Sequence, residues 1–232
     1  MMNISWDIAN FNISMKSQYS DIYELENDIS NFFGSSNFSE MDSLDWFLIN
    51  KKTNELSFLL LSVPSFFKAS SERHALDVDS LREIKLSECI GSFVSHVTIQ
   101  DEAVFQSKEN ILIVASDTSA IVYKTPIKEG LYFLLGCDFS HHGFLLLSAT
   151  HHIPGETPPS DETISDSLFL RMLDLCNQDF YDAMDEQDER CLSIINQLEK
   201  DCLAYQKIDV RLLQTIDFIK NLKYTFYDID ME

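Results

Sequence analysis

The stretch LYFLLGCDFSHHGFLLLSAT, residues 131–150, decides the fold class. It contains two apolar runs of strand length, Leu131–Gly136 and Phe144–Thr150, which are rich in residues that favour strands. Only a short polar break separates them. Because a parallel pair needs a crossover of about a dozen residues or more, this short connection favours antiparallel neighbours. The stretch therefore predicts an antiparallel sheet.

Further strands of the same kind precede this stretch. The sequence predicts them at Leu56–Val63, Ser92–Gln100, Asn110–Ser116 and Ala120–Lys124. The first is apolar almost throughout and ends at Pro64, as expected for a strand that is covered on both faces. Ala75–Glu88 is expected to form a loop or a short helix. Residues 46–152 are therefore predicted to be a β-rich core, a meander-like sheet of about five to seven strands.

A helix is predicted on the N-terminal side of this core, within residues 1–45. Four apolar residues at helical spacing indicate one amphipathic helix: Ile22, Leu25, Ile29 and Phe32. Ser20 is suitable as its N-cap, and Gly34 is suitable as the residue that ends it. The N-terminal part is thus expected to be helical and to pack on the sheet.

The clearest boundary in the chain is the junction at residues 153–160, IPGETPPS, which holds three of the five prolines. Beyond it, residues 161–232 predict two or three helices: Asp161 to about Met184, Asp188 to about Gln206 and Asp209 to about Phe226. Their expected inward residues are Ile164, Leu168, Met172, Leu175, Ile195, Leu198, Cys202, Tyr205, Leu212, Ile216 and Ile219. Stripes this apolar cannot stand alone in water, so these helices must pack on the sheet or on each other. Residues 1–232 are expected to form a single α+β domain.

The charge of the chain is strongly unbalanced. It has 38 Asp and Glu against 17 Lys and Arg, a formal net charge of −21, yet 45% of its residues are hydrophobic. With 17 Phe, 8 Tyr and 2 Trp, it can build a core, so disorder does not explain the charge. Direct nucleic-acid binding is not expected, because Lys and Arg are needed to neutralise phosphates. An acidic surface can instead imitate a duplex and occupy the basic groove of a nuclease.

The acids are concentrated in one segment. Between Glu156 and Arg190 there are eleven acidic residues and only two basic residues. Clustered carboxylates steer a cationic partner and raise its association rate. The candidate partner-binding residues are Asp179, Asp182, Asp185, Glu186, Asp188 and Glu189, with Phe180 and Tyr181 as candidate aromatic anchors. The alternative is a solvated helical face whose aromatic residues belong to the core.

The sequence contains no recognised catalytic motif. The patterns GxxxxGK[ST], GxGxxG, HExxH and GxSxG are absent. The residue types of a hydrolytic triad do occur together at Asp138, Ser140 and His141, but neighbours in one turn rarely have the facing geometry that a triad requires. No catalytic residue and no cofactor is therefore predicted.

Two histidine pairs suggest a metal site at first sight. His141–His142 and His151–His152 flank the predicted strand Phe144–Thr150, whose rise puts the pairs roughly 20 Å apart. A single metal cannot use both pairs. The remaining weak metal candidates are Cys137, His141 and His142, all expected at one hairpin turn, where a polar turn that happens to hold histidine is the simpler interpretation.

The features outside these segments favour a cytosolic protein. The five cysteines are scattered without a CxxC pair, the start does not resemble a secretory signal, and no apolar run approaches the roughly 18 residues of a membrane helix. The expected function is that of a bacterial immunity protein, which inhibits a basic toxin or effector, such as a nuclease, by covering its active site. The alternatives are a small-molecule enzyme or ligand-binding domain built on the turn at Cys137–His142, and an acidic secretion chaperone or adaptor.

Overall fold

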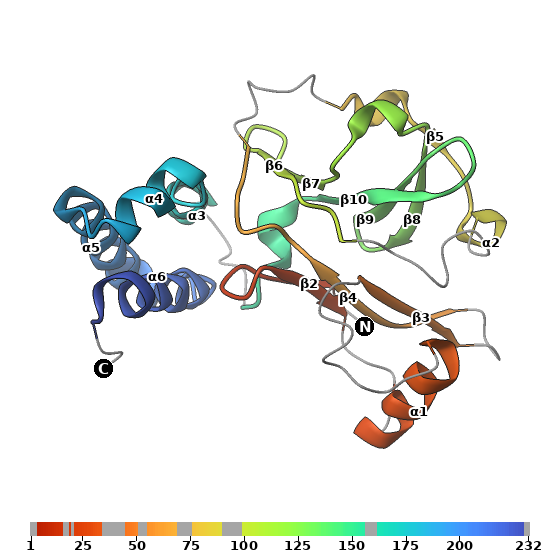
Figure 1. Ribbon diagram of the computed structural model, residues 1–232, viewed down its shortest axis with the longest axis horizontal. Helices are drawn as coiled ribbons and strands as arrows, with labels where there is room; N and C mark the ends of the chain where they lie inside the picture. Colours follow the sequence, from red (N-terminus) through yellow and green to blue (C-terminus); the bar gives the residue numbers. More distant parts are fainter. Residues whose placement is uncertain are drawn as a thin grey trace.

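The computed structural model describes residues 4–15, 19, 21–33, 45–50, 55–68, 76–89, 99–155 and 162–229. These residues form two sheets, of four and six strands, and six α-helices (Figure 1). The predicted α+β class is confirmed, with a mostly antiparallel sheet and C-terminal helices packed against it. The structure refines the prediction, because the strands divide between two sheets and the C-terminal segment holds four helices.

The smaller sheet is antiparallel throughout and has the strand order β1-β2-β4-β3. Its strands are β1 (Ile4–Asp7), β2 (Asn12–Met15), β3 (Trp46–Asn50) and β4 (Glu55–Ser62). The strand predicted at Leu56–Val63 is confirmed as β4, although Leu60 is 39% exposed and so its outer face is only partly covered. The hairpin β1–β2 lies in the part predicted to be helical, and its strands are too short to give a sequence signal.

The larger sheet has the strand order β5-β8-β9-β10-β7-β6. Its strands are β5 (Arg82–Glu83), β6 (Ala103–Gln106), β7 (Ile111–Val114), β8 (Tyr123–Lys128), β9 (Leu131–Leu135) and β10 (His141–Leu147). Strands β8, β9 and β10 follow one another as the predicted meander, but β7 lies beside β10 instead of β8. Strand β5 pairs with β8 in parallel, and every other pairing is antiparallel.

Strand β10 begins earlier than predicted, at His141, and ends at Leu147. A bulge between His141 and Gly143 makes this start possible. Gly143 has φ +134° and lies so close to β7 that an added Cβ would meet the Val114 carbonyl oxygen at 2.0 Å. Only glycine fits there. The first residues of the strand are polar, so the sequence does not indicate that the strand begins there. The two His pairs do lie at opposite ends of β10, because His151 and His152 belong to the 3-10 helix η5 (Ala149–His152).

Two other strand predictions need correction. The strand predicted at Ala120–Lys124 starts at Tyr123 and continues through Pro126, and Ala120 ends the 3-10 helix η4 (Thr118–Ala120). Pro126 lies beyond the two residues of β8 that pair with β5, and its pairing with Tyr132 of β9 is followed at once by a register shift, a position where a strand tolerates proline. Of the strand predicted at Ser92–Gln100, residues 92–98 lie outside the described part, and Ile99 and Gln100 precede β6 without joining a strand.

The core lies between the two sheets and continues into the C-terminal helices. Phe47 of β3 meets Phe133 of β9 edge to face, with ring centroids 5.4 Å apart. Strand β9 is buried on both faces, because Phe133 points into this core while Leu134 joins a second cluster on the far side of the sheet. That far side is covered by Leu76, Val78 and Leu81, which lie in and beside the 3-10 helix η2 (Val78–Ser80). The short helix α2 (Leu86–Cys89) instead packs against the first core. A strand covered on both faces reads as a continuous apolar run, as Leu131–Leu135 does.

The predicted N-terminal helix is confirmed as α1 (Ile22–Phe33), which packs on the outer face of the smaller sheet through Leu25 and Ile29. The N–H of Glu24 donates to the Asp21 carboxylate at 2.9 Å, so the described capping bond comes from Asp21. The proposed cap Ser20 and the proposed stop Gly34 lie outside the described residues.

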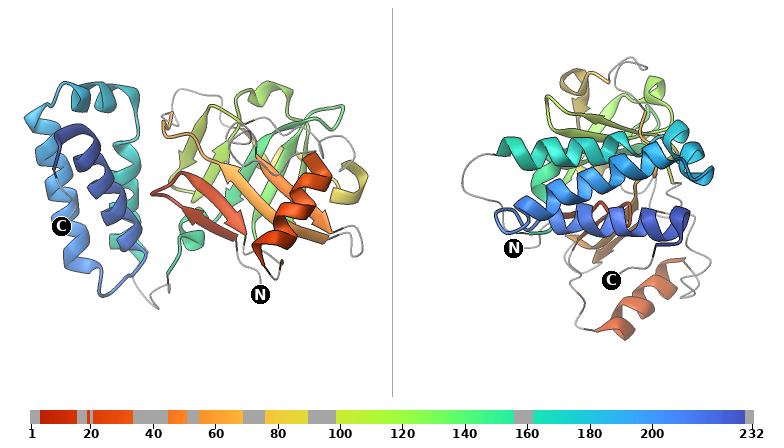
Figure 2. Two further views of the ribbon diagram at one scale, coloured as in Figure 1. Left: turned by 60° about the horizontal axis from the view of Figure 1, so that its bottom comes forward. Right: turned by 90° about the vertical axis from the view of Figure 1, so that its left-hand side faces the viewer.

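The C-terminal helices are α3 (Glu162–Asp174), α4 (Gln178–Asp185), α5 (Glu189–Tyr205) and α6 (Leu212–Tyr227). Figure 2 shows them as one layer across the end of the sheets. The helix predicted at 161–184 is broken after Asp174, because Asn177 caps a new helix by accepting from the Phe180 N–H at 2.9 Å. Most of the predicted inward residues are buried, but Ile164 (43% exposed) and Tyr205 (36% exposed) are not. Of the junction 153–160, residues 156–160 lie outside the described part.

The helical layer joins the sheets through apolar and polar contacts. Phe11, in the β1–β2 turn, meets Phe218 of α6 edge to face with ring centroids 5.7 Å apart. Arg211 is fully buried between the layers, where it pairs with Asp209, donates to the Thr150 carbonyl oxygen at 3.0 Å and lies over the ring of Phe169. Among the described helices, none has the length and apolar character needed to cross a bilayer.

Candidate functional site

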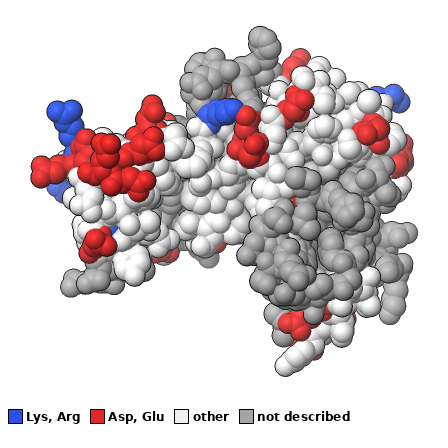
Figure 3. Space-filling view, viewed as in Figure 1, with Lys and Arg blue, Asp and Glu red and all other residues white. Residues whose placement is uncertain are grey.

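Six carboxylates lie on α4 and at the start of α5, and we call them the α4 acidic surface: Asp179, Asp182, Asp185, Glu186, Asp188 and Glu189. Figure 3 shows acidic side chains gathered over this end of the helical layer. Five of the six are exposed and Asp188 is half-buried. The Asp188 carboxylate is the N-cap of α5 and accepts from the Arg190 N–H at 2.6 Å. The acids predicted as a docking surface therefore do share one surface.

These carboxylates have no cationic partner within the described part of the chain. The described ion pairs of the helical layer are Arg171–Asp201, Lys223–Glu199 and Arg211–Asp209. The layer thus uses several of its bases to pair acids elsewhere. The field over the α4 acidic surface is left negative.

The two candidate anchors, Phe180 and Tyr181, are half-buried and pack against the core. The ring of Tyr181 lies between Phe66 and Phe226, with centroid distances of 5.0 and 5.6 Å, and meets both edge to face. Burial raises the pKa of Tyr181, so its hydroxyl stays protonated. Both aromatic residues therefore contribute to packing, and only their outer edges are available to a partner.

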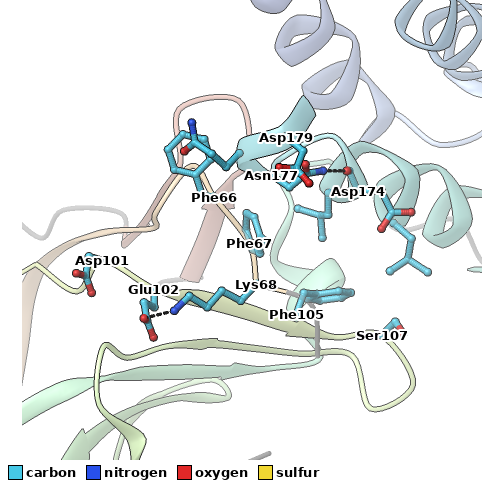
Figure 4. A pocket seen from close by; sticks show the side chains of 13 residues that line it. Phe66, Phe67, Lys68, Asp101, Glu102, Phe105, Ser107, Asp174, Asn177 and Asp179 are labelled. Carbon is cyan, nitrogen blue, oxygen red and sulfur yellow. Dashed lines mark hydrogen bonds and ion pairs between the residues drawn. The ribbon is translucent and has the colours of Figure 1, made fainter. Parts of the chain in front are cut away.

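A groove of about 680 Å³ lies beside this surface, between the segment Phe66–Lys68 and β6 on one side and the α3–α4 connection on the other. We call it the junction groove. Figure 4 shows the carboxylates of Asp174 and Asp179 on its helical side. On the sheet side lie Phe105 and the ion pair of Lys68 with Glu102 (Figure 4). Asp179 belongs both to the groove and to the α4 acidic surface, so the two are continuous.

The walls of the junction groove are fixed by backbone hydrogen bonds. The Phe67 N–H donates to the Cys176 carbonyl oxygen at 2.7 Å, and the Lys68 N–H donates to the Ala103 carbonyl oxygen at 2.8 Å. One short segment is thus bonded to the helical layer on one side and to the larger sheet on the other. The shape of the groove is therefore already formed before a ligand arrives.

The turn between β9 and β10 holds the residues that were candidates for chemistry. The Ser140 hydroxyl donates to Asp138 Oδ1 at 2.5 Å and lies 3.1 Å from His142 Nε2. Serine, not histidine, is the middle residue of this series of hydrogen-bonded side chains. A hydrolytic triad needs the histidine between serine and carboxylate, where it takes the serine proton. Because the Ser140 proton is already donated to Asp138, this turn is arranged as a hydrogen-bonded loop and not as a nucleophile.

The weak metal candidates Cys137, His141 and His142 are not brought together. Cys137 is exposed, whereas the ring nitrogens of His141 are buried and its ring lies edge-on to Phe133 with centroids 5.0 Å apart. Burial, with the neighbouring His142 as a smaller cause, lowers the pKa of His141 to about 3. Across the described residues, no three His, Cys, Asp or Glu side chains are grouped so that they could hold a metal ion.

The junction groove was missed by reasoning from the sequence alone. Its two sides come from segments far apart in the chain, Phe66–Lys68 and Asp174–Asp179, which meet only because the helical layer packs across the ends of the sheets. Phe66 offered a weak signal, since it follows Pro64 at the end of a predicted strand, where an aromatic residue that is 40% exposed is available for contact. No known family, curated protein or solved structure matches this chain.

Proposed function

We propose that this protein binds a basic protein through the α4 acidic surface and inhibits it by covering its active site. The biological class that fits is a bacterial immunity protein acting in the cytosol against a basic toxin or effector. A nuclease is a suitable target, because a surface of carboxylates imitates the phosphates that a nuclease groove binds. Proteins that meet basic partners in this way gain association rate from charge and affinity from a few buried contacts.

The observation that carries this proposal is that the part of the α4 acidic surface at the C-terminal end of α4 acts against the stability of that helix. Asp185 is the last residue of α4 and Glu186 is its C-cap, where the negative end of the helix dipole disfavours a carboxylate. Asp182 lies one helical turn before Glu186, so like charges also repel along the same face. No basic residue occupies the last turn of α4 to offset this. An arrangement that costs the fold free energy is expected where binding requires it.

The proposed inhibition works through charge first and packing second. The negative field attracts the cationic face of the partner at long range, and the carboxylates then pair with its Lys and Arg side chains. The outer edges of Phe180 and Tyr181 lie within the same surface and add apolar contact. Salt should weaken the complex, because exposed charges are screened beyond about 8–10 Å at moderate ionic strength.

The test replaces four charges and leaves the shape intact. The test variant carries Asp182→Asn, Asp185→Asn, Glu186→Gln and Asp188→Asn; asparagine also caps helices well, so α5 should keep its N-cap. The matched control carries Asp79→Asn, Glu83→Gln, Glu109→Gln and Glu129→Gln, four exposed acids of the sheet part. Both variants change the net charge equally. The test variant should associate about ten-fold more slowly with the partner and lose most of its salt dependence.

The control variant should keep an association rate close to that of the parent protein. Equal slowing in both variants would show that only the total charge matters. Unchanged association of the test variant would contradict the proposed surface and move the interface to another face of the molecule.

A further inference from the structure

We propose that the junction groove receives an arginine side chain, carried on an extended segment of the basic partner. This inference rests on the proposed function, since it names the part of the partner that enters beside the α4 acidic surface. The occupant follows from the charges, the aromatic rings and the size of the groove.

The charge of the groove calls for a cation. Four acidic residues and one basic residue line it, and the base, Lys68, is paired with Glu102. On the helical side, the carboxylates of Asp174 and Asp179 take part in no ion pair or hydrogen bond with any described residue. Two exposed carboxylates at one rim, with the nearby ammonium already engaged, match a cationic ligand and repel a phosphate.

The aromatic residues distinguish arginine from other cations. Phe66, Phe67 and Phe105 line the same space, and Figure 4 shows Phe67 between the helical and sheet sides. A guanidinium group is flat and weakly hydrated, so it stacks on an aromatic ring while its N–H groups bond to carboxylates. A lysine ammonium is compact and strongly hydrated and gains less from such a groove. A metal ion is not favoured, because no metal-binding group exists among the described residues.

The size of the groove indicates a peptide segment and not a free small cation. Its volume of about 680 Å³ exceeds that of one side chain, so the backbone on either side of the arginine can lie within it. The fixed walls favour this, because a groove that is already formed loses little conformational entropy on binding. Asp179 links the groove to the α4 acidic surface, so one partner can contact both at the same time.

The experiment uses three dye-labelled nonapeptides of glycine and serine with two central positions occupied by arginine, lysine or citrulline. Binding to the full chain is measured by fluorescence anisotropy at low salt. The arginine peptide should bind about three- to five-fold more tightly than the lysine peptide, and the neutral citrulline peptide should bind at least ten-fold more weakly than the arginine peptide. Equal affinity for arginine and lysine would overturn the proposal, because charge alone would then explain binding.

Two groove variants locate the site. Asp174→Asn with Asp179→Asn should weaken the arginine peptide about ten-fold, and Phe66→Leu should remove most of the preference for arginine over lysine. The matched controls are Glu109→Gln with Glu129→Gln, which removes two exposed charges of the sheet part outside the groove, and Tyr23→Leu, which removes an exposed aromatic ring on α1. Thermal unfolding of each variant verifies that it folds. If Phe66→Leu does not fold, the variant with Asp174→Asn and Asp179→Asn still tests the proposal.

The outcomes separate this inference from the proposed function. If the groove variants and their controls weaken the peptide equally, the groove is not the arginine site, even if the charge variants of α4 still slow association with the partner. If the groove variants alone weaken the peptide while the α4 variants leave partner association unchanged, the groove is a peptide site and the proposed inhibitory surface is wrong.

Discussion

Asp209 and the carboxylates of α4 lie in the same helical layer but in opposite surroundings. Asp209 is buried against Arg211, whose Nη2 donates to it at 2.7 Å. Asp185 and Glu186 are exposed at the end of α4, with no cation paired to them among the described residues. Asp209 pairs with Arg211, which also bonds to the Thr150 carbonyl oxygen outside the helical layer. The described contacts give the carboxylates of Asp185 and Glu186 no comparable role in the fold. The difference indicates which acids serve the structure and which are free to serve a partner.

The largest effect is expected from breaking the buried pair. Arg211→Met should lower the free energy of unfolding by about 3–5 kcal/mol, because it leaves Asp209 as an uncompensated buried charge. The double variant Asp209→Asn with Arg211→Met should recover part of this loss. Urea unfolding, followed by the fluorescence of the buried Trp6 and Trp46, measures both variants. A loss below about 1 kcal/mol in the single variant would show that the pair does not hold the two layers together.

A second buried acid, Asp45, tests the comparison of buried and exposed acids through the pH dependence of stability. Asp45 is 2% exposed and accepts from the Ser62 N–H at 2.6 Å, and burial raises its pKa to about 7 against the lowering effect of that bond. Between about pH 4 and 7 the folded protein therefore holds a proton that the unfolded chain has lost, so this group lowers stability as the pH rises through that window. Asp45→Asn should stabilise the protein by about 4 kcal/mol more at pH 8 than at pH 4, as measured by urea unfolding. An equal effect at both pH values would contradict the raised pKa.

The smallest effect is expected at α4 itself. Asp185→Asn and Glu186→Gln should each raise the melting temperature by about 1 °C at low salt, because they remove charges that oppose the helix dipole. Asp179→Asn, in the first turn of the same helix, should lower it slightly, since a carboxylate is favoured there. Calorimetry in low and high salt measures the three variants, and salt should reduce all three changes. A lower melting temperature for Asp185→Asn would show that this carboxylate has a stabilising role in the fold.

The same comparison shows what could be predicted from the sequence. Long apolar runs such as Leu131–Leu135 gave the right strands, and exposed acids such as Asp185 were correctly placed at the surface, because burial and exposure follow from residue type. The break between α3 and α4 was missed, since neither glycine nor proline marks it and the side-chain cap of Asn177 decides it. The start of strand β10 was predicted three residues too far along the chain, because pairing of its first residues depends on the close approach of Gly143 to β7.

The site was only half predictable for a related reason. The charge of α4 is local in the sequence, so it could be found by counting acids. The junction groove depends on Phe67 bonding to Cys176 and Lys68 bonding to Ala103, contacts that exist only after the helical layer and the sheets have packed. Tertiary packing of this kind leaves no local pattern.

The proposed function is tested most directly by identifying what the protein binds in cytosol from its own host. The protein is immobilised, the cytosol is passed over it at low salt, and the captured proteins are eluted with salt and identified. We expect one basic protein to be captured in about equal molar amount and to be released by salt. Its activity should be lost again when this protein is added back to it. The four-charge variant of α4 should capture far less of it than the matched sheet variant does. Capture of only acidic or neutral proteins, or equal capture by both variants, would contradict the proposed role of the α4 acidic surface.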